Sequence, residues 1–130
     1  MKKILIVDDE PHNRILLQEI LEDLEDDGLQ LYYAADGAEA LRVVQSEKPA
    51  LVFMDVMLPD ADGLEICHRI KARSGFEDIF IVMLTALGQS SDIKKASGQS
   101  DLYITKPFKS KVIKDVVNRV FGCAPTSQQD

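Results

Sequence analysis

The stretch "ALVFMDVMLPDADG", residues 50–63, places a carboxylate, Asp55, directly after a run of apolar residues. An apolar run of this length is typical of a strand that is buried on both faces of a sheet. The end of such a strand meets a loop, so a polar residue there leaves the core while its backbone stays on a rigid element. Asp55 is therefore either the first residue of an ordinary loop or a reactive group that the strand displays.

The composition is that of one globular domain. The chain has 130 residues, of which 45% are hydrophobic and 28% charged, and this length allows a substantial core. The apolar runs are shorter than the ~20 residues of a membrane helix, and the first residues lack a cleavage site, so we expect a cytoplasmic chain without a membrane segment. We assign residues 1–122 to the domain and expect the polar stretch 123–130 to be a flexible tail or the start of a linker.

The net charge of −7 limits the partners of the domain. Direct binding to nucleic acid requires a basic surface, which this excess of acidic residues does not favour. A negative surface suits bound cations or a basic partner protein instead. The two cysteines, Cys67 and Cys123, are too far apart for metal-ligand spacing, so we expect them to be reduced thiols.

Apolar runs and amphipathic stretches alternate along the chain. The expected strands are residues 3–7, 31–34, 51–54, 79–84 and 102–104. The expected helices run from Asn13 to about Asp26 with Gly28 as the stop, from Asp36 to about Ser46, from Leu64 to a stop at Ser74 and Gly75, weakly over 90–97, and over 113–121 before Gly122. Apolar strands joined by helical crossovers predict an α/β fold, with a five-stranded parallel sheet covered by helices on both faces.

Several polar residues follow the expected strands directly. In a parallel sheet the carboxyl ends of the strands meet at one edge, where ligands bind. At that edge we expect the carboxylates of Asp8, Asp9 and Asp55, the hydroxyl of Thr85 and the ammonium of Lys106. Three neighbouring carboxylates repel one another, and a divalent cation such as Mg²⁺, which prefers oxygen ligands, removes that repulsion.

Each of these residues also has an ordinary structural interpretation. The acids after the first strand could form a solvated turn before a helix. Thr85 could bond a backbone group, and Lys106 could be an ordinary surface lysine. We interpret Asp36 as a helix cap, and Asp60 and Asp62 as solvated loop acids.

Four motifs occur in order at the expected strand ends: "ILIVDDE", "MDVMLPDADG", "VMLTA" and "YITKPF". With these motifs the chain closely resembles the receiver domain of two-component response regulators, over about residues 2–121. The resemblance implies a flavodoxin-like receiver fold, in which the five parallel strands have the order 2-1-3-4-5.

The resemblance implies roles in phosphoryl transfer for several residues. Asp55 would be the phosphoacceptor and form an acyl phosphate, which Lys106 and Thr85 would contact. Tyr103 would be the aromatic switch residue, which swings inward when Thr85 moves; the alternative is an exposed aromatic residue at the sheet edge. The peptide bond between Lys106 and Pro107 is expected to be cis.

The resemblance also implies a metal site. Mg²⁺, for which Mn²⁺ could substitute, would be bound by Asp9, Asp55 and the backbone carbonyl of Met57. Asp8 would act through a bound water molecule. Positive charge would then lie where negative charge builds up during phosphoryl transfer.

The implied function is a signalling switch rather than an enzyme, although the domain would take part in its own phosphorylation and slow dephosphorylation. The donor would be a phosphohistidine on a sensor histidine kinase or a histidine phosphotransfer protein. Phosphorylation would change the surface of helix 4, strand 5 and helix 5. That surface would regulate a downstream protein or a fused output domain, or form a homodimer through the helix 4–helix 5 face.

Two other classes of protein remain as alternatives. A flavodoxin-like module would hold FMN or another anion at the same strand ends, but the first loop, "DDEPHN", repels anions unless a metal is bound. A haloacid-dehalogenase-type phosphatase requires Asp-x-Asp after the first strand, and here the acids are adjacent. The sequence also lacks the glycine-rich loops that hold nucleotide phosphates.

Two segments depart from the family pattern. In "GQSDLY", Gln99 and Ser100 replace a usual Gly-Ala pair and Leu102 replaces a common acid, so the end of helix 4 and the choice of partner are expected to differ. Met57 and Leu87 occupy the positions that flank the attacking water, and both are apolar. Because neither side chain orients water, we expect the phosphorylated state to decay over hours rather than seconds.

Overall fold

The chain forms a five-stranded parallel sheet in the order β2-β1-β3-β4-β5, as predicted. The computed structural model describes residues 2–23, 28–85, 101–106 and 108–121. The strands are β1 (Lys2–Val7), β2 (Leu29–Ala34), β3 (Leu51–Asp55), β4 (Phe80–Thr85) and β5 (Leu102–Thr105). The helices in the described residues are α1 (Pro11–Glu22), α2 (Gly37–Glu47), α3 (Gly63–Lys71) and α5 (Ser110–Phe121).

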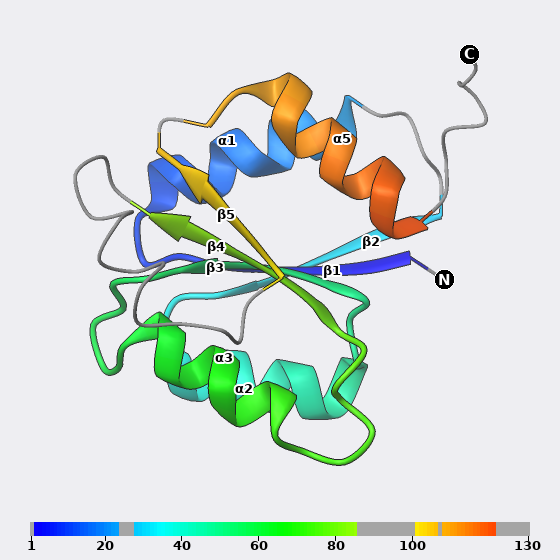
Figure 1. Cartoon of the computed structure of the whole chain (residues 1–130). Helices are drawn as coiled ribbons and strands as arrows, with labels where there is room; N and C mark the ends of the chain where they lie inside the picture. Colours follow the sequence, from blue (N-terminus) through cyan, green and yellow to red (C-terminus); the bar gives the residue numbers. More distant parts are fainter. Residues whose placement is uncertain (1, 24–27, 86–100, 107, 122–130) are drawn as a thin grey trace.

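Helices cover both faces of the sheet (Figure 1). α1 and α5 lie on one face, and α2 and α3 lie on the other. The central strand β3 is buried at every position. Its residues alternate between two cores, since Val52 and Met54 pack on the α2–α3 side while Leu51 and Phe53 pack on the α1–α5 side. This double burial explains why the strand is a continuous apolar run.

The first helix begins earlier than predicted. It starts at Pro11 rather than Asn13, because proline at the first helical position loses no intrahelical hydrogen bond and has a preset φ. The helix ends at Glu22, so Gly28 is not its stop. Gly28 lies directly before β2, and its carbonyl accepts a hydrogen bond from the Lys2 N–H at 3.2 Å.

Other boundaries also differ from the prediction. β2 begins at Leu29, two residues early, because it pairs in register with the start of β1. α3 ends at Lys71, with Ala72 as its cap, rather than at Ser74 and Gly75. Gly75 has a φ of 92° and belongs to the turn that follows.

Several sequence-based expectations fall outside the described residues. These are Leu87, the weak helix over 90–97, the pair Gln99 and Ser100, the cis bond before Pro107, Gly122, and the tail 123–130. Among the helices that are described, none has the length and apolarity to cross a membrane.

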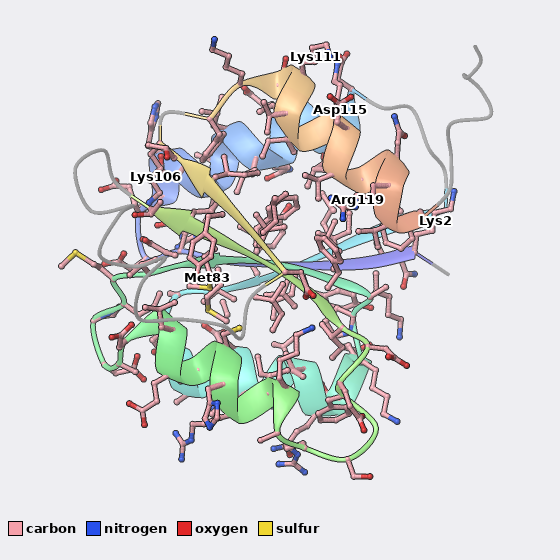
Figure 2. All side chains as sticks on the ribbon, viewed as in Figure 1. Lys2, Met83, Lys106, Lys111, Asp115 and Arg119 are labelled. Atoms are coloured by element: carbon pink, nitrogen blue, oxygen red, sulfur yellow. The ribbon has the colours of Figure 1, made fainter. Side chains whose placement is uncertain are left out.

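The parallel register brings the carboxyl ends of the strands to one edge. In the middle of the sheet, Val7 pairs with Met54 and Asp55 pairs with Leu84. Lys106 follows β5 at this carboxyl edge, whereas Lys2 lies at the opposite, amino edge (Figure 2). The carboxyl ends of β1, β3, β4 and β5, with Asp55 ending β3 and Thr85 ending β4, therefore lie along one edge of the sheet.

Candidate functional site

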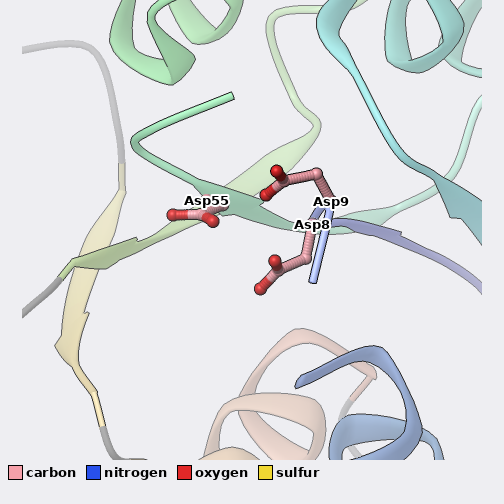
Figure 3. A group of neighbouring side chains, drawn as sticks. All are labelled: Asp8, Asp9 and Asp55. Carbon is pink, nitrogen blue, oxygen red and sulfur yellow. The ribbon is translucent and has the colours of Figure 1, made fainter. Parts of the chain in front are cut away.

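Three carboxylates meet at the carboxyl edge (Figure 3). Asp8 and Asp9 follow β1, Asp55 ends β3, and one carboxylate oxygen of each lies within 4.8 Å of the others. Asp8 is fully buried and Asp55 is 8% exposed, while Asp9 is exposed. Negative charges this close repel strongly when water is excluded. The set of oxygen donors fits Mg²⁺, which accepts a few carboxylates and retains several waters.

Hydrogen bonds hold Asp8 in place from three sides. Its N–H donates to the Ala34 carbonyl at 3.0 Å, and its Oδ1 accepts from the Glu10 N–H at 2.9 Å. Arg14 Nη1, in the first turn of α1, donates to the Asp8 carbonyl at 2.6 Å. The Arg14 contact was not predicted, because the sequence around an arginine near a helix start does not indicate which group the arginine will bind. The turn after β1 is thus tied to both β2 and α1.

Lys106 contacts two of the carboxylates. Its Nζ lies 3.4 Å from Asp8 Oδ2 and 3.3 Å from Asp55 Oδ2. Its backbone N–H donates to the Thr85 carbonyl at 2.7 Å, which fixes the residue beside the end of β4. The side chain is 21% exposed, so its charge is only partly screened by water. Lys106 therefore lies beside the acids rather than on the open surface.

Asp55 is energetically strained as an anion. Burial raises the pKa of its carboxyl group, and the neighbouring Asp8 carboxylate raises this pKa further. The ammonium of Lys106 and the Met57 N–H, 3.3 Å from Asp55 Oδ1, oppose the rise. Additional positive charge at this position would favour the ionised carboxylate.

Thr85 and Tyr103 lie on neighbouring strands. Thr85 is fully buried at the end of β4, in register with Thr105 of β5. Tyr103 pairs with Met83, and its ring packs against the core on the α2–α3 side. The Tyr103 hydroxyl is buried and has no hydrogen-bond partner among the described residues. Tyr103 is therefore not an exposed edge aromatic; its role as a switch stays a prediction.

The loop after Asp55 folds back tightly on the strand. Gly63 N–H donates to the Val56 carbonyl at 2.7 Å, and a Cβ on Gly63 would collide with the Asp55 carbonyl oxygen. Only glycine fits this close approach. Met57 lies in the same loop and is 63% exposed, and its backbone forms an isolated antiparallel β-bridge with Asp62. The loop is therefore an ordered part of the site.

Asp60 and Asp62 are exposed loop acids, as predicted, but each also caps a helix, which was not predicted. Asp62 caps α3 by accepting a hydrogen bond from the Leu64 N–H at 2.9 Å. Asp60 accepts from the first N–H groups of α2. The spacing Asp62-x-x-Glu65 is that of a capping box and signals the first contact. The partner of Asp60 is 23 residues away, so no local pattern names it.

The predicted cap of α2 is confirmed. Asp36 accepts a hydrogen bond from the Glu39 N–H at 2.8 Å. Glu39 Oε1 in turn accepts from the Ala35 N–H at 2.9 Å, so the two acids form a variant of the capping box. This arrangement identifies Asp36 as a structural residue.

Comparisons with known proteins agree on one family. The family model described as "Response regulator receiver domain" matches residues 4–118. The chain is similar to Sporulation initiation phosphotransferase F of Bacillus subtilis (strain 168), with 38% identity over 91% of this chain and 92% of that protein. It is also similar to the probable transcriptional regulator ycf27 of Cyanophora paradoxa, with 44% identity over 85% of this chain. The chain spans only 44% of the length of that regulator.

A solved structure gives the same result. The receiver domain of a sensor histidine kinase from Pseudomonas aeruginosa PAO1 superimposes with a TM-score of 0.80 and 28% identity, over 93% of this chain and 98% of that one. That neighbour holds a magnesium ion coordinated in its active site cleft. The present chain belongs to the response regulator receiver domain family.

Proposed function

We propose that this chain is a phosphorylation-controlled switch that accepts a phosphoryl group on Asp55. One observation carries the proposal: the carboxylate at the end of the central strand lies within a cluster of acids and 3.3 Å from the ammonium of Lys106. Membership of the receiver family supports it. On this proposal the chain takes part in its own phosphorylation and slow dephosphorylation without turning over an external substrate.

The proposed reaction is a displacement at phosphorus. An oxygen of the Asp55 carboxylate would attack the phosphorus of a phosphohistidine, forming the P–O bond of an acyl phosphate. The P–N bond of the donor would break, and its electron pair would leave with the imidazole, which takes up a proton. Lys106 favours the ionised, nucleophilic form of Asp55 and would pair with the transferred group. Thr85 would donate its hydroxyl hydrogen to a phosphoryl oxygen.

The acids at the carboxyl edge fit a bound Mg²⁺. Asp9, Asp55 and the Met57 carbonyl would be its direct ligands, Asp8 would act through a water molecule, and Mn²⁺ could substitute. When bound, the ion would supply positive charge where negative charge builds up during transfer. The magnesium in the neighbouring receiver structure supports this assignment. Hydrogen bonds from Glu10 and Arg14 fix the position of Asp8 within this cluster of acids.

The output would follow from movement of two residues on adjacent strands. Thr85 would shift toward the phosphoryl group, and Tyr103 would respond by moving further inward. The altered surface, around β5 and α5, would then be read by a downstream protein or a fused output domain. One relative is a probable transcriptional regulator that is more than twice as long as the matched region, and this favours an output domain. A sensor histidine kinase or a histidine phosphotransfer protein would be the donor, and a homodimer through the helix 4–α5 face is a further form of output.

The charge of the site argues against the flavin-binding alternative. Asp8 and Asp55 are buried at the position where a flavin phosphate would lie, and their carboxylates repel phosphate in the absence of a cation. Absorbance of purified protein at flavin wavelengths checks this point. A colourless preparation agrees with the switch.

The test of the proposal is incubation with acetyl phosphate and Mg²⁺, followed by intact mass measurement. We expect the wild-type protein to gain one phosphoryl group, and Asp55→Asn to gain none. Asp78→Asn is a matched control, because Asp78 is an exposed aspartate at the opposite edge of the sheet. Removing Mg²⁺ with a chelator should abolish the gain. An equal gain by Asp55→Asn would show that the acceptor is another residue.

A further inference from the structure

Two carboxylates from different parts of the chain cap the N-terminus of α2. Asp36, which precedes the helix, accepts from the Glu39 N–H at 2.8 Å. Asp60, from the loop between β3 and α3, accepts from the Gly37 N–H at 2.7 Å and from the Ala38 N–H at 3.1 Å, one on each oxygen. The first N–H groups of a helix have no partner within the helix, and the helix end attracts negative charge. Asp60 thus joins the loop to α2.

The packing around this contact is close. A Cβ on Gly37 would lie 2.9 Å from Ile66 Cδ1 and 3.3 Å from the Ala61 Cβ. The first turn of α2 therefore rests directly against α3 and against the residue after Asp60. Leu58 and Ala61 also pack on the apolar core of this face. The contact between Asp60 and α2 is held by apolar packing as well as by hydrogen bonds.

The same loop carries the backbone next to Asp55. Met57 bridges to Asp62 in antiparallel fashion, and Leu58 N–H donates to the Ala61 carbonyl at 3.3 Å. These pairs make residues 57–62 a small hairpin with Asp60 near its tip. The base of the hairpin lies at the site, where Met57 N–H donates to Asp55 Oδ1. Fixing the tip against α2 therefore restrains the base.

We infer that Asp60 is a positioning residue for the metal site: by capping α2 it fixes the hairpin 57–62, and with it the backbone carbonyl of Met57. The inference rests on the proposed function, which makes that carbonyl a metal ligand. Without the Asp60 contact the hairpin samples more orientations, and metal binding must then restrict them at a cost in affinity. Changes to residues that orient metal ligands typically weaken binding by about 10- to 100-fold.

The experiment compares two caps of the same helix. Asp60→Ala and Asp36→Ala each remove one carboxylate from the N-terminus of α2, but only Asp60 also holds the hairpin. Mg²⁺ affinity is measured on the full chain by isothermal titration calorimetry. We expect Asp60→Ala to weaken Mg²⁺ binding by about tenfold and Asp36→Ala to leave it within about twofold.

A second readout needs no metal. Amide hydrogen exchange of the metal-free protein should be faster at Met57 and Gly63 in Asp60→Ala than in Asp36→Ala. Asp60→Asn removes the charge but keeps one acceptor oxygen, so its affinity should lie between those of wild type and Asp60→Ala. This variant also serves if Asp60→Ala does not fold.

Two results would overturn the inference alone. In the first, the wild-type protein binds Mg²⁺, and Asp60→Ala and Asp36→Ala change the affinity to the same extent. The other is equal weakening by Asp60→Asn and Asp60→Ala with unchanged amide exchange, which would show a long-range effect of charge. Absence of Mg²⁺ binding in the wild type would instead overturn the proposed function, and this inference with it.

Discussion

Charged side chains are arranged differently at the two edges of the sheet. At the amino edge, two ion pairs each match one acid with one base: Lys3 lies 3.2 Å from Glu47, and Lys71 lies 2.7 Å from Asp101. At the carboxyl edge, Asp8 and Asp55 share the ammonium of Lys106, and Asp9 adds a third carboxylate. Natural proteins often accept a cost in stability where function requires it. The ion pairs of the amino edge, called here the matched edge, join elements of the fold. The carboxyl edge, called here the unmatched edge, retains the negative charge that would bind a cation on the proposed function.

Asp101, at the amino edge, has several partners. Asp101 Oδ2 accepts from the Ile81 N–H at 2.9 Å as well as from Lys71. Its own N–H donates to the Ile81 carbonyl at 3.0 Å, which extends the pairing between β4 and β5. Lys71 Nζ also donates to the Glu77 carbonyl at 3.3 Å. These contacts join the end of α3 to the start of the two strands, and the charges of Lys71 and Asp101 neutralise each other.

The largest expected contrast between the edges concerns metal affinity. Asp8→Asn removes one charge from the unmatched edge, and we expect it to weaken Mg²⁺ binding by about 10- to 100-fold, as changes next to a metal do. Glu47→Gln removes one charge from the matched edge and should leave the affinity within about twofold. Titration calorimetry measures both. If Glu47→Gln weakened binding as much as Asp8→Asn, the overall charge of the chain rather than the local cluster would bind the ion.

The next effect concerns the lifetime of the phosphorylated state. Met57 is apolar and 63% exposed beside Asp55, so its side chain does not orient an attacking water molecule. We expect decay over hours, and Met57→Gln should accelerate it by about tenfold, since orientation of a reactant has effects of at least this size. Release of inorganic phosphate after removal of the donor measures the rate. Val112→Gln, on an exposed apolar residue of α5, is the control. A wild-type half-life of seconds would contradict the prediction.

A third prediction tests how much stability the fold loses by burying the Asp55 carboxylate at the unmatched edge. The pKa of Asp55 is raised above its ordinary value of 3.8, chiefly by burial, so the folded state binds this proton more tightly than the unfolded state. The stability that Asp55 contributes is therefore complete below pH 3.8 and is lost as the pH rises through the folded-state pKa.

Asp55→Asn should accordingly stabilise the metal-free protein at pH 7, by about 1 kcal/mol, the size of effect usual for relieving a functional site. The gain should shrink as the pH falls toward 4. Urea unfolding at several pH values measures it. Asp101→Asn, at the matched edge, should destabilise the protein at pH 7. Equal destabilisation by both variants would mean that the two edges do not differ.

The smallest effect concerns a pair at the matched edge. Lys71 and Asp101 are partly exposed, so a double-mutant cycle with Lys71→Met and Asp101→Asn should give a coupling of about 0.5 kcal/mol. Added salt should reduce this value. Mg²⁺ affinity should stay the same in all three variants. A coupling of zero would show that the ion pair between Lys71 and Asp101 contributes nothing to the free energy of unfolding.

Much of the site follows from local sequence patterns. Asp8, Asp55 and Thr85 each follow or end an apolar run, and parallel strands bring such positions to one edge. The order of the strands was predicted from the family motifs and is confirmed. The roles of these residues in phosphoryl transfer stay predictions.

Element boundaries were predicted less well, because packing partners decide them. β2 starts at Leu29 since β1 offers Lys2 as a pairing partner there, although the apolar run begins later. Gly28 has the residue type of a helix stop, but its carbonyl bonds to the start of β1. Local propensity limits which conformations a residue can adopt, and pairing with the neighbouring strand determines which of them it has in the fold.

The sequence alone determined the alternation of strands and helices, the family, and which acids leave the sheet at its carboxyl edge. Each of these depends on residues that are close in the chain. The tertiary structure decided which charges are shared or matched: Lys106 lies beside Asp8, 98 residues away, and Asp60 caps a helix that begins 23 residues before it. Such contacts depend on how the helices pack on the sheet. The residues next to a loop carboxylate do not indicate which helix terminus it will cap.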